Sequence, residues 1–490
     1  MNRPIVRLYG LVAALFALLV AFTSRWTIFE AASLRENPEN QRMLLEQERI
    51  PRGEIVAADG TVLARSVLGG ASSPQGEGVY QRTYPTGELF AQPIGYDYIA
   101  PEDLGATGVE RFRNKDLSGQ NGTNLQSVLD QLQGKEPRGD KVITTLDPHA
   151  QRVAMDTLGE HEGAVVALDP STGAVEVMAS KPSYDPNALR SPARKRAQER
   201  EMSAHPPTKS VLNRALQYGY APGSTFKIVT ATAAIDSGAY TPQSLVSGQN
   251  EILVSGVPLK NDDNESFGPI TLTQALAHSV NTVWAQVAEH VGKRTLRRYM
   301  ERFGFDRKPQ LDYPADEMSA SGEHSGESIV APTSPLVDLG RLGIGQDKLA
   351  VTPLQMAEVA AAVANHGTLM VPHLTKRIVD SEGATVQTVS PRVQSVVMKP
   401  STASAVTGMM EAVVREGTGT AAQIPGIQVA GKTGTAQTQF GDAINNVWFI
   451  AFAPAGAPRV AVAVTLKAVP GEGATFAAPV ARSVIESLLG

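Results

Sequence analysis

The 490-residue sequence contains no cysteine, which removes several classes of protein at once. It can hold no disulfide framework, no cysteine-liganded metal and no thiol nucleophile. The sequence also lacks a strong excess of charge of either sign. It contains 44 Lys and Arg and 49 Asp and Glu, which gives a net charge of -5. So small a charge argues against nucleic acid as a partner. No internal repeat is visible either.

The composition that remains is that of a globular protein. Hydrophobic residues make up 42% and charged residues 19% of the chain, which supplies ample material for a core. The length favours two or three domains.

One uncharged apolar run lies near the N-terminus. Residues 8–23 carry no charge, two arginines precede them, and Arg25 follows. The run is longer than the core of a typical signal peptide and shorter than a full membrane span of about 20 residues. No clear A-x-A cleavage site follows it. We predict a single transmembrane anchor over residues 8–25, a cytoplasmic tail over residues 1–7, and an extracytoplasmic remainder at the plasma membrane. A cleaved signal peptide is the alternative, and it would export the same domain.

The pattern of apolar and turn-forming residues changes at about residue 141. Before it, residues 30–50 are polar and predict a short helical stalk, and residues 67–140 are rich in Gly, Pro, Asn and Gln. We predict a small, irregular, β-rich pedestal or dimerisation-like domain over residues 26–140, which includes a hairpin that turns at Asp59-Gly60.

Residues 141–490 predict an α+β domain in which helices pack on an antiparallel sheet. Two segments, 185–210 and 314–329, are charged or rich in Ser, Gly and Glu, and we expect surface loops there. We expect strands at 142–146, 164–168, 174–179, 427–433, 446–453 and 459–467, and helices from Asp147 or Pro148 and at 224–236, 271–292, 353–366, 402–416 and 479–489.

The helix predicted at 224–236 begins with two unusual polar residues. Ser224 and Lys227 are three apart behind Pro222-Gly223, in a helix that is otherwise apolar on nearly all sides and therefore buried. Positions i and i+3 share a face, so Lys227 is expected over the Ser224 hydroxyl. A buried lysine releases its proton readily, and the neutral amine can accept one from serine. Taken alone the pair is a weak signal, because Ser is a common helix cap and lysines often snorkel.

Two further motifs follow in a fixed order. Ser279 and Asn281 form S-x-N, and Lys432, Thr433 and Gly434 form K-T-G with Thr435 beyond. Together with S-x-x-K, this ordered trio is the signature of penicillin-binding proteins and class A β-lactamases. A metal ion or another cofactor is not expected.

The resemblance extends well beyond the motifs. Segments such as AVVALDPSTGAVEVMASKPSYDPN, LNRALQYGYAPGSTFK and GIGQDKLAVTPLQMA resemble penicillin-binding transpeptidases, over about residues 141–490. RGEIVAADGTVLA and GATGVE resemble the pedestal of the monofunctional, class B group, and the likeness is greatest to its short penicillin-binding protein A members from high-GC Gram-positive bacteria. The resemblance implies a serine β-lactamase-like fold with an all-helical lobe beside the sheet.

The resemblance also implies roles for the motif residues. The enzyme would be a peptidoglycan D,D-transpeptidase that acts on stem peptides ending in D-Ala-D-Ala and is acylated by β-lactams. Ser224 would be the nucleophile and Lys227 its base, and the backbone N–H groups of Ser224 and Thr435 would form the oxyanion hole. Ser279 would pass a proton to the leaving group, and Asn281 would bind the substrate amide and steady Lys227. The substrate carboxylate would be held by Lys432, Thr433, Gly434 and Thr435.

Two other hypotheses for the function stay open at this point. Water as acceptor would make the chain a D,D-carboxypeptidase or a β-lactamase, and a non-catalytic β-lactam-binding scaffold or sensor would retain the site without the reaction. The family likeness alone suggests a polytopic membrane glycosyltransferase as partner.

Three local patterns have simpler explanations than the functions they suggest. GIQVAGKT at 426–433 fits the P-loop pattern, but no helical period follows it, so we expect a strand. NDDNESFG at 261–268 lacks the register of an EF-hand and is expected to be a solvated loop. His278 is expected to be a packing or surface histidine rather than a base.

Overall fold

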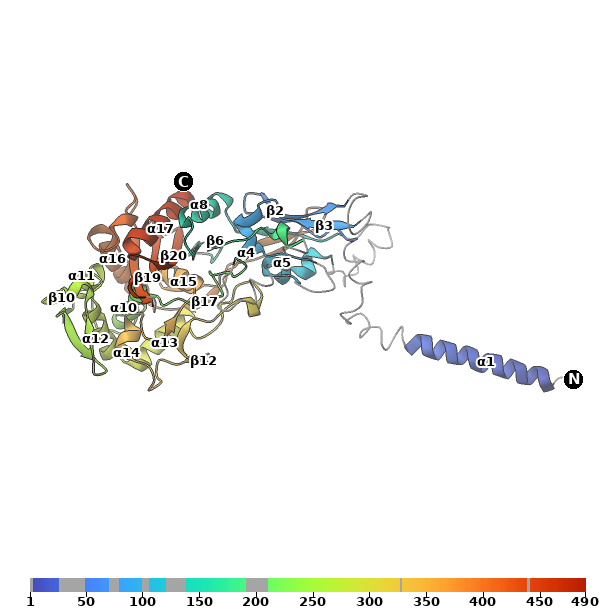
Figure 1. Cartoon of the computed structure of the whole chain (residues 1–490), viewed down its shortest axis with the longest axis horizontal. Coiled ribbons are helices and arrows are strands. Elements are labelled where there is room, and N and C mark those ends of the chain that lie inside the picture. The colour runs from blue at the N-terminus through green and yellow to red at the C-terminus, as the bar shows by residue number, and fades with distance from the viewer. Residues whose placement is uncertain are drawn as a thin grey trace.

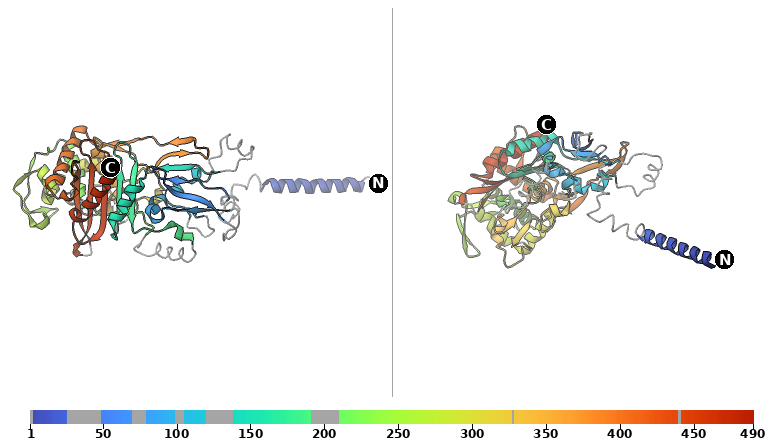
Figure 2. Two further views of the ribbon diagram at one scale, coloured as in Figure 1. Left: turned by 90° about the horizontal axis from the view of Figure 1, so that it is seen from above. Right: turned by 45° about the vertical axis from the view of Figure 1, so that its right-hand side comes forward.

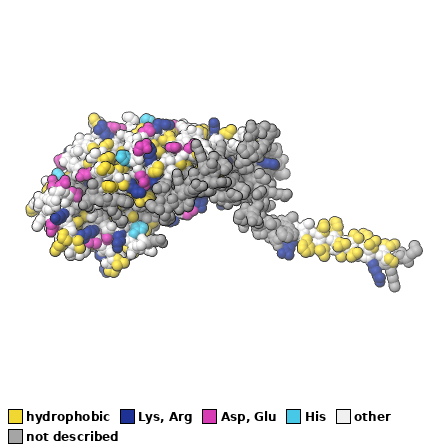
Figure 3. Space-filling view, viewed as in Figure 1, with side chains coloured by type: hydrophobic (Ala, Val, Ile, Leu, Met, Phe, Trp, Pro, Cys, Tyr) yellow, Lys and Arg dark blue, Asp and Glu magenta, His cyan; other side chains and the backbone are white. Residues whose placement is uncertain are grey.

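The computed structural model describes residues 3–25, 49–69, 79–98, 105–119, 138–190, 210–326, 328–438 and 441–490. Helix α1 (Arg3–Ser24) stands apart from the rest, and hydrophobic side chains cover its visible surface (Figures 1 and 3). It is long and apolar enough to cross a membrane: an 18-residue stretch of it has a mean hydropathy of 2.4, and none of that stretch is buried. Of the pedestal predicted over residues 26–140, residues 26–48, 70–78, 99–104 and 120–137 lie outside the described residues.

A six-stranded sheet joins the pedestal to the C-terminal part of the chain. Its order is β16-β15-β4-β1-β2-β3, with β1 and β4 parallel and the other pairs antiparallel. The predicted hairpin is confirmed as β1 and β2. The predicted division between residues 140 and 141 falls directly before β4. Because β4 pairs with β1, this first strand after the division belongs to the same sheet as the pedestal strands. The strands are β1 (Ile55–Val56), β2 (Val62–Leu68), β3 (Tyr80–Thr83), β4 (Lys141–Thr144), β15 (Thr375–Val379) and β16 (Thr385–Thr388).

A buried ion cluster holds the pedestal together. Glu110, on helix α5 (Gly108–Phe112), is fully buried, and its carboxylate accepts from Arg52 Nε at 2.8 Å and from Arg82 Nε at 2.5 Å. Burial by itself raises the pKa of Glu110, but the two guanidinium groups outweigh it and lower the pKa. The cluster also connects the two sequence segments that resemble the class B pedestal, since Arg52 comes from the first and Glu110 from the second.

The second sheet is antiparallel and forms the centre of the C-terminal domain. Its order is β18-β19-β20-β5-β6, and β5 and most of β20 are buried along their length. Helices α8 and α17 pack on one face and α15 packs on the other, which explains why these strands are continuous apolar runs (Figure 2). The elements are β5 (Gly163–Leu168), β6 (Val175–Lys181), β18 (Ala430–Thr438), β19 (Gly441–Ala453), β20 (Val460–Val469), α8 (Pro148–Leu158), α15 (Pro353–Ala364) and α17 (Gly473–Leu489).

A lobe made mainly of helices lies beside this sheet (Figure 1). Its core is α10, whose first eight residues are all buried. The lobe contains the 3-10 helix η4 (Gly223–Phe226), α10 (Lys227–Asp236), α11 (Leu272–Ala277), α12 (Asn281–Val291), α13 (Lys293–Phe303), α14 (Leu339–Gly343) and α16 (Pro400–Glu416), with hairpins that include β7 (Leu245–Ser247), β8 (Glu251–Val254), β9 (Val257–Lys260) and β10 (Pro269–Thr271).

The α+β architecture and every predicted strand of the second sheet are confirmed, while two local predictions are wrong and one helix was missed. The helix predicted over 271–292 is two helices, α11 and α12, because Ser279 interrupts it with a left-handed backbone (φ 58°). The surface loop predicted over 314–329 contains β11 (Gly322–Ser325) and part of β12 (Ser328–Val330). Helix α13 was not predicted.

We predict that Glu110→Ala destabilises the chain. The substitution leaves the buried Arg82 without its carboxylate and Arg52 with Asp97 alone, and removing one partner of a buried ion pair costs about 3–5 kcal/mol. Thermal unfolding of the full chain in detergent should show a clearly lower midpoint. Glu88→Ala is the matched control, because Glu88 is an exposed acid of the same domain. Equal midpoints for the two variants would contradict the structural role of the cluster.

Candidate active site

The serine of S-x-x-K lies on a tight turn pressed against strand β18. Gly223 has φ 51°, and a Cβ there would lie 2.6 Å from the Thr435 carbonyl oxygen. A Cβ on Gly434 would lie 2.7 Å from the Pro222 carbonyl oxygen. The two glycines therefore let the turn and the strand meet backbone to backbone. Ser224, half-buried, is placed by this contact next to the K-T-G strand.

The serine of S-x-N occupies the interruption between α11 and α12. Ser279 is buried, and its left-handed backbone is uncommon for a residue with a side chain. Such strain costs about 1–3 kcal/mol and often occurs at functional sites. The interruption turns the Ser279 hydroxyl toward two lysines and lets α12 begin at Asn281.

Lys227 is fully buried and bound to the S-x-N motif. Its Nζ donates to the Ser279 carbonyl oxygen at 2.6 Å and to Asn281 Oδ1 at 2.7 Å, and it lies 3.2 Å from Ser279 Oγ. Burial lowers the pKa of Lys227 to about 7, against the opposing charge of Asp262. The amine is therefore neutral in a large fraction of molecules at neutral pH. Among the described residues Lys227 makes no hydrogen bond to Ser224, so that direct pairing stays a prediction.

Lys432 approaches the same hydroxyl from strand β18. Its Nζ donates to Ser279 Oγ at 3.0 Å, to the Thr433 carbonyl oxygen at 3.1 Å and to Thr433 Oγ1 at 3.3 Å. Burial, and then the neighbouring charge of Lys227, lower the pKa of Lys432 well below its ordinary value. The Ser279 hydroxyl thus bridges two amines that cannot easily both be charged. Such a bridge can carry a proton between them.

The structure therefore brings the three predicted motifs together. Side-chain hydrogen bonds join Lys227, Ser279, Asn281, Lys432 and Thr433, and backbone contacts bring Ser224, Gly434 and Thr435 beside them. The Thr435 hydroxyl accepts a long hydrogen bond, 3.4 Å, from the Gly473 N–H at the start of α17. Its own proton remains available to donate to a ligand.

Two residues near the motifs escaped the sequence analysis. Thr418, which follows α16, has its hydroxyl 2.6 Å from the Thr433 hydroxyl, and its N–H donates to the Ala277 carbonyl oxygen. Asp262 accepts a hydrogen bond from Asn281 Nδ2 at 3.2 Å. Neither position carries a sequence signal that connects it with the motifs, since only tertiary folding brings the distant segments together.

The two alternative motif interpretations fail on geometry. Lys432 and Thr433 lie within strand β18, where a P-loop would begin a helix, so the predicted strand is confirmed. His278 is exposed and stacks on the ring of Phe267, with centroids 5.8 Å apart, which confirms the prediction of a surface histidine.

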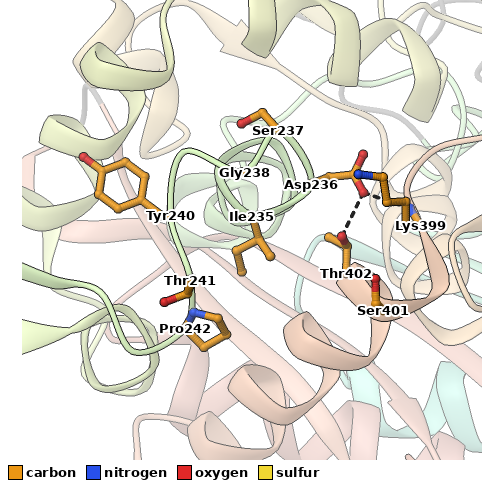
Figure 4. Close-up of a pocket in the computed structure, with 10 residues that line it drawn as sticks. All are labelled: Ile235, Asp236, Ser237, Gly238, Tyr240, Thr241, Pro242, Lys399, Ser401 and Thr402. Carbon is orange, nitrogen blue, oxygen red and sulfur yellow. Dashed lines mark hydrogen bonds between the residues drawn. The ribbon is translucent and has the colours of Figure 1, made fainter.

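A hollow of about 310 Å³ lies at the other end of α10 from the motifs (Figure 4). There Asp236 accepts from the Lys399 N–H at 2.9 Å and from Thr402 Oγ1 at 2.8 Å, and so caps the start of α16. The hollow has no motif residue in its lining, and its Asp236 joins α10 to α16. It is lined by Ile235, Asp236, Ser237, Gly238, Tyr240, Thr241, Pro242, Lys399, Ser401 and Thr402.

Comparison with known proteins agrees with the motifs and the fold. The family model described as the penicillin binding protein transpeptidase domain matches residues 163–486, and that of the penicillin binding protein A dimerisation domain matches residues 52–142. Peptidoglycan D,D-transpeptidase PbpA of Mycolicibacterium smegmatis is 35% identical, with 100% of this chain and 99% of the relative covered. PbpA of Mycobacterium tuberculosis is 34% identical over the same shares.

Solved structures support the same assignment. The imipenem acyl-enzyme complex of penicillin-binding protein A from M. tuberculosis matches with a TM-score of 0.78 and 32% identity, covering 91% of this chain and 100% of the other. Its penicillin G acyl-enzyme complex matches with a TM-score of 0.78, covering 90% and 100%. Given the fold, the motif geometry and these matches, the chain belongs to the penicillin-binding protein transpeptidase family, in its class B group.

Proposed function

We propose that this chain is a peptidoglycan D,D-transpeptidase that works through an acyl-enzyme on Ser224. The observation that carries the proposal is the buried network in which Lys227 and Lys432 share the Ser279 hydroxyl. The relatives named above support the reaction, because two are named peptidoglycan D,D-transpeptidases and one was solved as β-lactam acyl-enzymes.

In the first half-reaction Ser224 Oγ attacks the carbonyl carbon of the penultimate D-Ala. The proton of Oγ passes to the neutral amine of Lys227 as the new C–O bond forms. Backbone N–H groups of Ser224 and Thr435 stabilise the oxyanion, an interaction whose loss costs about 10²–10³ in rate. The C–N bond then breaks, and the leaving D-Ala amine takes a proton through Ser279.

The second half-reaction transfers the acyl group to another stem peptide. An amine of that peptide attacks the ester and gives a proton to Lys227, the bond to Ser224 Oγ breaks, and Lys227 returns that proton to Oγ. Throughout, Lys432 and the hydroxyls of Thr433 and Thr435 hold the substrate carboxylate by hydrogen bonds. A β-lactam enters the same path and stops at the ester.

We place this reaction outside the plasma membrane, with α1 as the anchor. Arg3 and Arg7 lie at the N-terminal end of the apolar helix, which favours that end in the cytoplasm. Family likeness suggests a polytopic membrane glycosyltransferase as partner, and co-purification with α1 intact tests that pairing.

Replacing the nucleophile should abolish acylation. A fluorescent penicillin is expected to label the wild type covalently and to leave Ser224→Ala unlabelled, because no other hydroxyl takes its place. Gel fluorescence after denaturation measures the bound label. A circular dichroism spectrum like that of the wild type is the control for folding. Labelling that survives in Ser224→Ala would reject the nucleophile.

Acylation should also depend on pH through Lys227. The pKa of Lys227 is about 7, and the protonated amine has no lone pair for the serine proton. The acylation rate should therefore level off above pH 7 and fall by about tenfold per unit well below it. Stopped-flow labelling across pH 5 to 9 measures the profile. A rate that stays flat down to pH 5 would show that a different group is the base.

The fate of the acyl-enzyme distinguishes a transpeptidase from a β-lactamase, a D,D-carboxypeptidase and a non-catalytic scaffold or sensor. The wild type should release bound penicillin slowly and should exchange a labelled D-amino acid into a model stem peptide, followed by mass spectrometry. Rapid penicillin turnover would indicate a β-lactamase, and release of D-Ala without exchange would indicate a carboxypeptidase. Penicillin binding without either reaction would indicate a scaffold or sensor.

A further inference from the structure

The loop that follows β9 reaches the S-x-N motif. Asn261 is buried, its Nδ2 donates to the Gly248 and Glu265 carbonyl oxygens, and its Oδ1 accepts from the Thr282 N–H at 2.9 Å. These bonds tie the loop to the first turn of α12. The next residue, Asp262, is thereby held with its Oδ1 3.2 Å from Asn281 Nδ2. The loop was expected to be a solvated surface segment, and Asp262 is indeed exposed, but its carboxylate bonds to a motif residue.

The carboxylate of Asp262 determines which way the Asn281 amide faces. An ionised carboxylate only accepts hydrogen bonds, and so does the Lys260 carbonyl oxygen, 3.4 Å from Asn281 Nδ2. Both neighbours therefore select the NH₂ end of the amide. The oxygen end must face the other way, toward Lys227 Nζ at 2.7 Å.

This orientation has a consequence for the lysine lone pair. A neutral amine has two N–H groups and one lone pair. Both acceptors beside Lys227, the Ser279 carbonyl oxygen and Asn281 Oδ1, take an N–H. The lone pair is then left for a hydroxyl: Ser279 Oγ lies 3.2 Å away, and the proposed acylation step requires the Ser224 hydroxyl to use the same lone pair. A flipped Asn281 amide would present N–H groups to the amine and compete for the lone pair.

We infer that Asp262 is a positioning residue for the acylation step, because it fixes the Asn281 amide and through it aims the lone pair of Lys227. The inference rests on the proposed function, since it assigns Lys227 as the base. It extends the site beyond the three motifs, to a loop that none of them includes.

The charge of Asp262 adds a second effect on the same lysine. Within the described part of the chain, the ionisable groups whose charge acts on Lys227 or is acted on by it are Asp262 and Lys432. Nearby Lys260 lies 3.4 Å from Glu251, and His278 stacks on Phe267. Asp262 raises the pKa of Lys227 against the larger effect of burial. Removing the carboxylate therefore lowers that pKa further, and the neutral form persists to lower pH.

Two substitutions separate the effect of Asp262 on the orientation of the Asn281 amide from the effect of its charge on Lys227. Asp262→Asn removes the charge but keeps an oxygen that can accept from Asn281 Nδ2, whereas Asp262→Ala removes both. Asp263→Asn and Asp263→Ala are matched controls, because Asp263 is an exposed neighbour whose left-handed backbone (φ 52°) suits Asn. The measurement is the rate of fluorescent penicillin labelling across pH 5 to 9, on the full chain in detergent, with the unfolding midpoint of each variant.

Asp262→Asn should move the acid limb of the profile to lower pH while it keeps the plateau rate. Asp262→Ala should move the limb in the same way and also lower the plateau, by about tenfold for the lost orienting bond. Both Asp263 variants should follow the wild type.

Three outcomes would overturn the inference. The Asp262 variants could coincide with their Asp263 controls, their unfolding midpoint could fall without a change in the profile, or Asp262→Ala could keep the wild-type plateau. Failure of the proposed function is distinguishable, because the wild type itself would then take no label on Ser224.

Discussion

The burial of one amine is the constraint on which the site depends. Lys227 has no exposed surface, and its partners are a carbonyl, an amide oxygen and a hydroxyl. A buried ammonium that makes no ion pair with a carboxylate is costly, so the protein stabilises the neutral form and gains a base at neutral pH. Lys432 adds a second buried amine on the same hydroxyl, which disfavours charging both.

The fold around this amine is built to keep water away and to bring three distant segments into contact. Apolar helix α10 carries Lys227 into the core, and the Ser279 interruption points the second serine at it. Gly223 and Gly434 let the third segment approach without side chains in between. A larger residue at either glycine would push the K-T-G strand away from the nucleophile.

Much of this could be predicted from sequence, and what was missed has identifiable physical reasons. The buried sheet gives continuous apolar runs that predict strands, and the motif order alone indicated the family. The interruption at Ser279 leaves no periodic signal, because the flanking helices are apolar on either side of it. Helix α13 does place Leu296, Met300 and Phe303 at helical spacing, but Gly292 before it and its many charges obscured the pattern. Contacts such as Asp262 with Asn281 depend on tertiary structure and could not be predicted.

The most direct test of the account is the titration of the Lys227 amine itself. NMR of the full chain with ¹³Cε-labelled lysine can follow that signal, assigned by its loss in Lys227→Gln and separated from Lys432 by a matching Lys432→Gln sample. The account predicts a midpoint near pH 7. An amine that stays protonated through pH 9 would contradict it.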